Sequence, residues 1–437
     1  TTLPPEPVEE MSTDLLSLRR HPMPLAEDAA DEAADAAFVA GVAALSDEIG
    51  DTSCLRVVDD TDLVVDVGDG TTVIPASNEK LFVSATALEV LGADHRFRTE
   101  LWSAPPAGGV ITGNVYLVGG GDPVLRTADV PDPQRYPAFN TTSLEALADQ
   151  VVELGVTTID GDLVGDGSRY DDEFRVPSWG EDITSAEAGP YDALLVNDGL
   201  ISNGNYGLDP SRSAARVFAD LLIARGVTIT GSAANAARPA DAELASLAFI
   251  ESLPLTDILV ELLHTSDDNT AELMVKEIGY VAGEGGTRPA GLAVVRTTLG
   301  AWGVPLEGVE LQDGSGLSRL NRATCAALAA LLTTTPVADD LRELLPVAGR
   351  DGTLATQLLD TAAEGRLQAK TGTLTDVKAL TGTQPGADGR DVDFALVLNG
   401  ENVDDAEVYQ PIWEQLVELI SEYPIEVEPD TGPFAPR

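Results

Sequence analysis

The sequence predicts an α+β protein in which a helix-rich body is interrupted by an inserted domain of short strands. Three observations predict this class. Apolar residues recur at helical spacing toward both ends of the chain, short β-branched runs between glycine and proline fill the middle, and 437 residues suffice for two or three domains. We assign residues 25–95 and 255–422 to a discontinuous body and residues 96–254 to the insertion.

The first elements follow from local patterns. Residues 1–24 are acidic and proline-rich without a period, which predicts a flexible arm. Residues 25–49 are alanine-rich with apolar positions at helical spacing, which predicts a helix. Cys54–Val58 and Asp62–Val67 are β-branched runs joined by a turn, so we expect a hairpin. Leu81–Leu91 again has helical periodicity, and a glycine ends it.

The rest of the chain divides into the insertion and the second part of the body. In the insertion we predict strands at Phe97–Trp102, Val115–Val118, Asp162–Val164 and Thr228–Ile229, and helices at 143–154 and 212–225. In the body we predict helices at 255–280, 287–300, 322–334 and 405–421, strands at Leu367–Gly372 and Val392–Leu398, and a tail at 423–437.

The charge balance narrows the possible partners. Acidic residues outnumber basic ones by 73 to 26, which gives a formal net charge of −47. Such a field repels phosphate backbones and anionic lipid headgroups, so we expect no nucleic-acid partner. No apolar run of about 18 residues occurs, so we predict no membrane span. Only four basic residues are lysines, and lysine-poor acidic surfaces stay hydrated in molar salt. We interpret the composition as halophilic; the alternative is an ordinary acidic protein.

Metal-binding and redox patterns are not found in the sequence. The cysteines are Cys54 and Cys325, and the histidines are His21, His95 and His264. Two cysteines are too few for a disulfide framework, and their state is left open. Because no HExxH or CxxC pattern occurs, we expect no structural or catalytic zinc site. A Ser/His/Asp triad is also not favoured, because there is no GxSxG motif.

Ser77 and Lys80 form the first candidate pair. They stand three positions apart where a proline-marked loop enters the predicted helix, so they share one helix face. A serine hydroxyl becomes a nucleophile when a base takes its proton, and a desolvated lysine can be that base. The alternative is a capping serine next to a surface lysine.

Lys370-Thr371-Gly372-Thr373 forms the second candidate group, on a predicted strand. A strand edge with a small glycine lets a substrate backbone pair alongside it. The lysine would supply positive charge for a terminal carboxylate. The alternative is an exposed lysine before a turn. Two of the four lysines of the chain nevertheless fall in these two motifs, which weakens that alternative.

The third candidate group is Ser266, Asp268 and Asn269, just before a predicted helix. Serine acyl-transfer enzymes pair S-x-x-K with S-D-N and K-T-G, but here the third position is an aspartate and the asparagine comes one later. If Asp268 takes the place of the asparagine, its carboxylate holds a proton on Lys80 and makes that lysine a weaker base. If the loop is shifted by one residue, Asn269 restores the neutral amide. A third possibility is a simple N-cap cluster.

Together these motifs identify a family resemblance over roughly residues 35–421. The chain resembles the D-alanyl-D-alanine carboxypeptidase/endopeptidase family, the low-molecular-mass class C penicillin-binding proteins. The matching segments, in family order, are PASNEKL (75–81), YLVGGGDPVL (116–125), YDALLVNDG (191–199), DGSGLSR (313–319), LPVAGRDGTL (345–354) and LQAKTGTLTDVKALTG (367–382).

The resemblance implies a penicillin-recognising serine transpeptidase/beta-lactamase-like fold, with a five-stranded antiparallel sheet flanked by helices. It implies that Ser77 attacks a D-Ala-D-Ala carbonyl with Lys80 as general base, and that β-lactams are covalent inhibitors. Ser266, with Asn269 or Asp268, would relay protons and hold the substrate amide. Lys370 and Thr371 would bind the terminal carboxylate, next to Gly372. The backbone N–H groups of Ser77 and Thr373 would form the oxyanion hole. The resemblance implies neither a metal nor a cofactor.

Three functions therefore stay open at this point. The first is an active serine DD-peptidase. The second is a serine hydrolase of the same fold that acts on other peptides, amides or esters. The third is a catalytically silent peptide-binding protein, which the aspartate at position 268 favours. The family works outside the cytoplasm, yet no signal segment is visible, so a signal has either been removed or never existed, and a cytoplasmic location stays open.

Overall fold

The computed structural model describes most of the chain. The described residues are 36, 38–46, 48–129, 136, 138–180, 187–202, 205–240 and 243–424. The predicted arm at 1–24, the first part of the predicted helix at 25–35 and residues 425–437 of the predicted tail lie outside them. Tyr423, predicted as the first tail residue, is instead buried in the core and packs its ring against Phe38.

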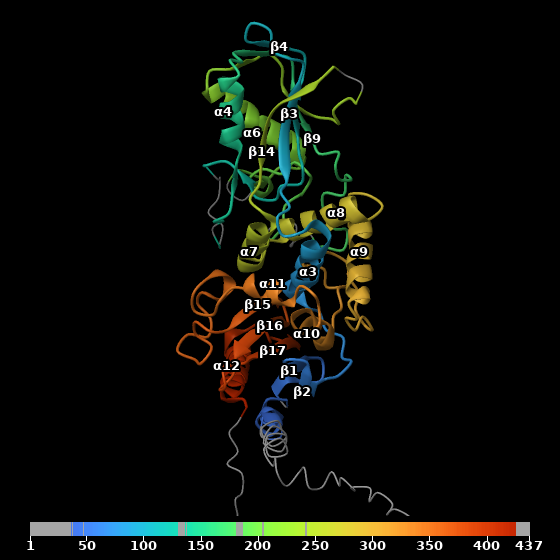
Figure 1. The fold of residues 1–437 in the computed structure, drawn as a ribbon, viewed down its shortest axis with the longest axis vertical. Helices are drawn as coiled ribbons and strands as arrows, with labels where there is room; N and C mark the ends of the chain where they lie inside the picture. Colours follow the sequence, from blue (N-terminus) through green and yellow to red (C-terminus); the bar gives the residue numbers. More distant parts are fainter. Residues whose placement is uncertain are drawn as a thin grey trace, which may run out of the picture.

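A five-stranded antiparallel sheet forms the centre of the body, as the resemblance implied (Figure 1). The strand order is β15-β16-β17-β1-β2, so the parts of the body before and after the insertion share one sheet. The strands are β1 (Cys54–Asp59), β2 (Asp62–Val67), β15 (Gln368–Leu374), β16 (Val377–Pro385) and β17 (Asp391–Asn399). The predicted hairpin is β1–β2, and β16 was not predicted. Strand β15 lies at one edge of this sheet.

Helices cover both faces of the sheet, because alternate residues of its central strands point to opposite sides. In β17, Val397 packs into a core built with α3 (Glu79–Leu91), whereas Leu396 packs into a second core built with α12 (Ala406–Glu422). The remaining helices of the body are α7 (Leu255–Thr265), α8 (Asp268–Ala282), α9 (Arg288–Ala301), α10 (Cys325–Thr333) and α11 (Ala338–Glu343).

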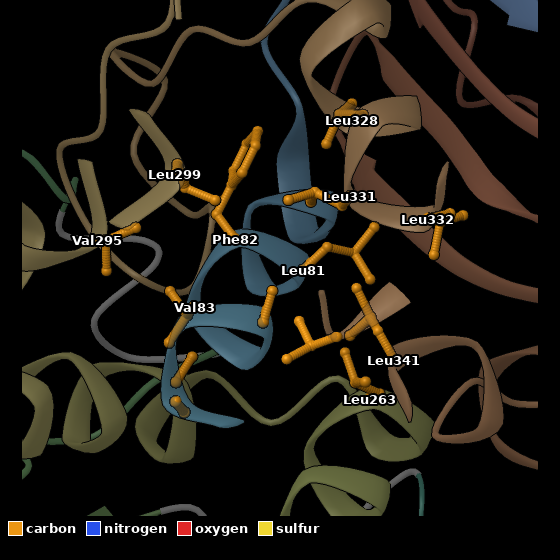
Figure 2. Packing of buried hydrophobic residues seen from close by; sticks show 14 of the residues in the cluster. Leu81, Phe82, Val83, Leu263, Val295, Leu299, Leu328, Leu331, Leu332 and Leu341 are labelled. Carbon is orange, nitrogen blue, oxygen red and sulfur yellow. The ribbon is translucent and has the colours of Figure 1, made fainter. Parts of the chain in front are cut away.

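Helix α3 is the central helix of the first core. All of its residues from Glu79 to Leu88 are buried, so it is surrounded by protein rather than packed on one face. Figure 2 shows Leu81 and Phe82 among apolar side chains of α7, α9, α10 and α11. The segment that begins with the predicted nucleophile is therefore held by packing on every side.

The predicted helix at 255–280 is two helices. Helix α7 ends at Ser266, which adopts a left-handed backbone conformation with φ of 62°. Helix α8 begins directly afterwards, and the Asp267 carboxylate accepts a hydrogen bond from the Thr270 N–H at 2.6 Å as its N-cap. The left-handed residue turns the chain sharply, so Ser266 and Asp268 project from the break between the two helices.

The inserted elements have a hydrophobic core of their own. They form a five-stranded sheet ordered β13-β9-β5-β3-β14 and a three-stranded sheet ordered β12-β8-β4. The principal elements are β3 (Arg98–Ser103), β4 (Val110–Thr112), β5 (Val115–Val118), β8 (Thr158–Asp160), β9 (Leu163–Asp166), β12 (Thr228–Ile229), β13 (Ala233–Asn235), β14 (Ala245–Glu251), α4 (Leu144–Glu153) and α6 (Pro210–Ala224). Their buried cluster draws only on residues between Leu101 and Ile250.

Ion pairs on α8 join the insertion to the body. Lys276, fully buried, lies 2.7 Å from the Asp171 carboxylate. Glu277, also fully buried, accepts two hydrogen bonds from Arg169 at 2.8 and 2.7 Å and one from the Tyr170 hydroxyl at 2.8 Å. Charge-assisted and bidentate contacts of this kind fix geometry as well as adding stability. The orientation of the insertion is thus set from α8.

A disulfide that the sequence left open joins Cys54 and Cys325. The two residues are 271 positions apart, and the bond ties β1 to the first residue of α10 with a Cα–Cα distance of 5.8 Å. Both cysteines are buried in the first core. The bond therefore links the N-terminal part of the body to the part that follows the insertion.

We predict that reducing this disulfide lowers the free energy of unfolding by about 2–5 kcal/mol, because the unfolded chain regains the freedom that a long closed loop removes. The measurement is denaturant unfolding at fixed salt with and without a phosphine reductant. The double variant Cys54→Ala/Cys325→Ala is the control, and reductant should leave it unchanged. A wild-type midpoint that does not move on complete reduction would contradict the prediction.

Candidate active site

Ser77 lies in a short 3₁₀ turn, η1 (Ala76–Asn78), that leads into α3. Pro75 starts the turn, and Ala76 has a left-handed φ of 48°, which is a strained conformation for a residue with a side chain. The buried Asn78 amide donates to the Thr381 hydroxyl of β16 at 2.7 Å. The sharp turn therefore presents Ser77 to the site, and the Asn78 side chain anchors this turn to β16 of the sheet.

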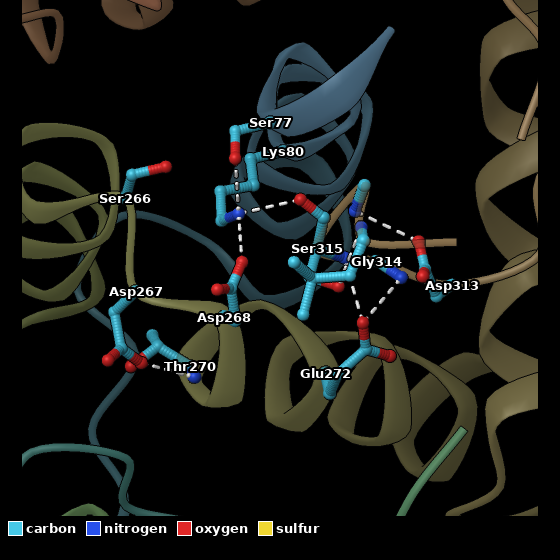
Figure 3. Close-up of polar contacts among 12 residues, drawn as sticks. Ser77, Lys80, Ser266, Asp267, Asp268, Thr270, Glu272, Asp313, Gly314 and Ser315 are labelled. Atoms are coloured by element: carbon cyan, nitrogen blue, oxygen red, sulfur yellow. Dashed lines mark hydrogen bonds and ion pairs between the residues drawn. The ribbon is translucent and has the colours of Figure 1, made fainter. Parts of the chain in front are cut away.

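Lys80 points toward the Ser77 hydroxyl, as the spacing predicts (Figure 3). Its fully buried ammonium nitrogen lies 3.1 Å from Ser77 Oγ, 2.6 Å from an oxygen of Asp268 and 2.6 Å from the Ser315 carbonyl oxygen. Three acceptors around one nitrogen satisfy the three donors of an ammonium group. The lysine is thus held in one position next to the serine.

Asp268, and not Asn269, faces Lys80. The Asn269 amide points the other way and donates to the Asp198 carboxylate of the insertion at 2.6 Å. Burial raises the pKa of Asp268 to about 6, and the neighbouring Lys80 ammonium limits the rise. Of the three possibilities left open by the sequence, the geometry brings the Asp268 carboxylate into the site, while Asp267 is the N-cap of α8.

Ser266 and Lys370 form a second serine–lysine contact in the same site. The Lys370 nitrogen lies 2.9 Å from Ser266 Oγ and 2.7 Å from the Thr371 carbonyl oxygen. Burial holds the pKa of Lys370 well below its usual range, and the nearby Lys80 charge lowers it further. An anion that enters the site stabilises the protonated form of such a buried lysine.

The remaining residues of the K-T-G segment lie on β15, the edge strand of the sheet. The Thr371 hydroxyl lies 2.7 Å from that of Thr353, and Thr373 is exposed and accepts from Lys378 at 3.0 Å. A Cβ on Gly372 would lie 2.9 Å from the Pro75 carbonyl oxygen, so the strand can pass this close to the nucleophile turn only with glycine. An edge strand next to a nucleophile can pair with an extended peptide.

Two residues of the site were not predicted to belong to it. Ser315 supplies a carbonyl to Lys80, and Glu272 of α8 accepts the backbone N–H groups of Gly314 and Ser315 at 3.0 and 2.8 Å. The segment 313–319 was quoted for the resemblance, but a backbone acceptor has no side-chain signature. Glu272 stands four positions after Asp268, and that helical spacing was the one available signal.

Neither histidine in the described part of the chain pairs with Ser77. His264 lies 3.7 Å from the Asp351 carboxylate, and His95 lies 3.7 Å from Glu277. No group of three or more histidine, cysteine or acidic residues that could hold a metal ion occurs among the residues the structure describes. No helix within the same ranges is long and apolar enough to cross a membrane.

Comparison with known proteins places this arrangement in a family. The model of the D-Ala-D-Ala carboxypeptidase 3 (S13) family matches residues 40–206 and 207–423. A D-alanyl-D-alanine carboxypeptidase of Actinomadura sp. (strain R39) is 34% identical over 416 residues, which cover 76% of this chain and 74% of that protein. A carboxypeptidase of Mycobacterium tuberculosis is 30% identical over 358 residues, which cover 77% and 75% of the two chains.

A solved structure shows the same fold. Penicillin binding protein 4 from Haemophilus influenzae aligns with a TM-score of 0.72 at 21% identity, covering 87% of this chain and 98% of that one. The family match spans both parts of the body and the insertion between them, and the S-x-x-K and K-T-G residues meet in one site. The chain therefore belongs to the D-Ala-D-Ala carboxypeptidase 3 (S13) family, the serine DD-carboxypeptidases, as the resemblance implied.

Proposed function

We propose that Ser77 is the nucleophile and Lys80 the general base of a peptidase that cleaves peptides ending in D-Ala-D-Ala. The observation that carries the proposal is the 3.1 Å contact between Ser77 Oγ and the buried Lys80 nitrogen. A nucleophile and base within hydrogen-bond reach, with the base oriented by further groups, is the arrangement that covalent catalysis requires.

The reaction proceeds through an acyl-enzyme. Neutral Lys80 takes the Ser77 proton, and Oγ attacks the carbonyl carbon of the penultimate D-alanine. The tetrahedral intermediate places its oxyanion on the backbone N–H groups of Ser77 and Thr373. Collapse breaks the peptide bond, and the departing D-alanine amine receives a proton relayed through Ser266. Water then attacks the ester and restores the Ser77 hydroxyl.

Lys370 and Thr371 are proposed to bind the terminal carboxylate of the substrate. Lys370 lies against Ser266 and on the strand that passes the nucleophile turn. Burial lowers the pKa of this lysine. An entering carboxylate therefore stabilises the protonated form of Lys370, and the protonated lysine attracts the carboxylate. The positive charge would therefore develop where the substrate anion sits, and Gly372 leaves room for the peptide backbone.

We further propose that β-lactams acylate Ser77 and that the protein works outside the cytoplasm. Penicillin binding protein 4 of Haemophilus influenzae has also been solved in complex with a β-lactam, at a TM-score of 0.64 and 20% identity to this chain. The disulfide between Cys54 and Cys325 supports the location, because such bonds persist in oxidising compartments.

We predict that benzylpenicillin adds one covalent equivalent to the full chain in molar salt, on the peptide that contains Ser77. The reason is that Lys80 activates Ser77 Oγ, which can then attack the strained lactam carbonyl. The adduct therefore detects the activated serine without a peptide substrate. Intact-mass analysis followed by peptide mapping makes the measurement. Ser77→Ala is the matched variant and should show no adduct. Full acylation of that variant would show that another residue is the nucleophile.

We predict that Asp268→Asn speeds acylation at pH 7 by on the order of tenfold, because the substitution removes a negative charge next to the nitrogen of the proposed base. The carboxylate 2.6 Å from Lys80 stabilises the ammonium form, which cannot accept a proton. An asparagine keeps an acceptor oxygen there without the charge. The measurement is the acylation rate with a chromogenic β-lactam across pH.

The control for this prediction is Asp267→Asn, which makes the same chemical change one residue earlier. Asp267 caps α8 and has no hydrogen bond to Lys80 among the contacts of the described residues, and asparagine caps helices equally well. We expect it to acylate at the wild-type rate. If Asp268→Asn were slower than wild type, the carboxylate would be needed for the reaction rather than restraining its base.

A further inference from the structure

Lys80 contacts two acceptors besides Ser77. Residues on one face of α8 either supply or hold each of these two acceptors. Asp268 contacts the ammonium directly at 2.6 Å. Glu272, one helical turn later on α8, contacts the turn that carries the second acceptor, the Ser315 carbonyl (Figure 3). Residues four apart lie on the same face of a helix, so both point toward the nucleophile helix.

The turn around Ser315 is fastened by two carboxyl groups. Glu272 Oε1 accepts the N–H groups of Gly314 and Ser315 at 3.0 and 2.8 Å. Asp313 accepts the N–H groups of Gly316 at 2.9 Å and Ser318 at 2.7 Å. The Ser315 carbonyl belongs to the peptide unit that ends in the Gly316 N–H. Glu272 therefore fixes the two peptide units before this carbonyl, and Asp313 fixes the unit that carries it.

The same turn also touches the nucleophile segment. Gly316 has a φ of +88°, and a Cβ on it would lie 1.9 Å from the Ala76 carbonyl oxygen. The turn is therefore in close contact with the residue before Ser77 as well as bonded to Lys80. A shift of this turn would move the acceptor of the base relative to the nucleophile that the base serves.

We propose that Glu272 is a positioning residue for catalysis: by holding the Gly314–Ser315 backbone, it keeps the Ser315 carbonyl on Lys80 and the lysine on Ser77. The inference rests on the proposed function, in which Lys80 is the base. Glu272 touches neither Ser77 nor Lys80 in the hydrogen bonds described, so it acts through the turn. Geometric errors of about 1 Å in a reacting pair cost about 100-fold in rate.

The contacts indicate that a neutral side chain is sufficient at this position. Only Oε1 accepts the backbone donors, while the buried Oε2 has no hydrogen-bond partner among the described residues. Burial raises the pKa of Glu272 to about 8, and the nearby Asp313 contributes to the rise, which favours the neutral carboxyl group. Glutamine has the same length and offers the same carbonyl oxygen.

The test measures the rate constant of benzylpenicillin acylation and the constant for the preceding non-covalent binding, by rapid mixing of the full chain in molar salt. Glu272→Ala should acylate about 100-fold more slowly with little change in non-covalent binding. Glu272→Gln should stay within a few-fold of wild type. Glu272→Asp, which withdraws the oxygen by one methylene, should be at least about tenfold slower and serves if the alanine variant does not fold.

The matched control is Ile278→Ala, on the same helix. Ile278 is fully buried in the first core, so its truncation lowers the unfolding temperature without touching the turn. It should acylate at the wild-type rate. The inference is overturned if Glu272→Ala and Glu272→Asp acylate as fast as this control, or if Glu272→Gln is as slow as Glu272→Ala. If wild type itself forms no acyl-enzyme, the proposed function fails, and this inference fails with it.

Discussion

The burial of one ammonium group is the constraint on which the site depends. Lys80 has no exposed surface, yet in the proposed mechanism its nitrogen, 3.1 Å from Ser77 Oγ, exchanges a proton with that serine. A charge removed from water is tolerated only where hydrogen bonds and an opposite charge replace the solvent. Asp268 and the Ser315 carbonyl do this at 2.6 Å each. The packing of α3 on all sides, the break before α8 and the turn at 313–318 all serve to bring these acceptors to one point.

Helix α8 connects the chemistry to the domain organisation. Its first turns carry Asp268, which contacts Lys80 of α3 directly, and Glu272, which binds the turn at 313–318 that also contacts Lys80. Its later turns carry Lys276 and Glu277, which bind the insertion through Asp171, Arg169 and Tyr170. Two of the four lysines of the chain, Lys80 and Lys370, lie in the site, and Lys276 lies at this junction. Three of the four lysines of this acidic chain are thus fully buried, at the site or at the junction with the insertion.

Much of the fold and the contact between Ser77 and Lys80 could be predicted because they depend on local periodicity and spacing. Ser77 and Lys80 are neighbours on a helix whatever the rest of the chain does. The choice between Asp268 and Asn269 could not be predicted, because the left-handed conformation of Ser266 sets the start of α8 and only tertiary packing fixes that residue. The disulfide between Cys54 and Cys325 joins residues 271 positions apart, and no spacing rule reaches that far. The halophilic interpretation and the roles of the individual site residues stay predictions.

The measurement that tests the central claim most directly is the release of D-alanine from an N-acylated tripeptide ending in D-Ala-D-Ala, with the peptide ending in D-Ala-L-Ala as its stereochemical control. The account predicts that the full chain, folded in molar salt, releases D-alanine from the first peptide catalytically, leaves the second intact, and loses the activity when Ser77 is replaced by alanine. A folded chain that binds the first peptide without cleaving it would contradict the account and indicate a binding protein. Cleavage that ignores the configuration of the last residue would indicate a serine hydrolase of different specificity.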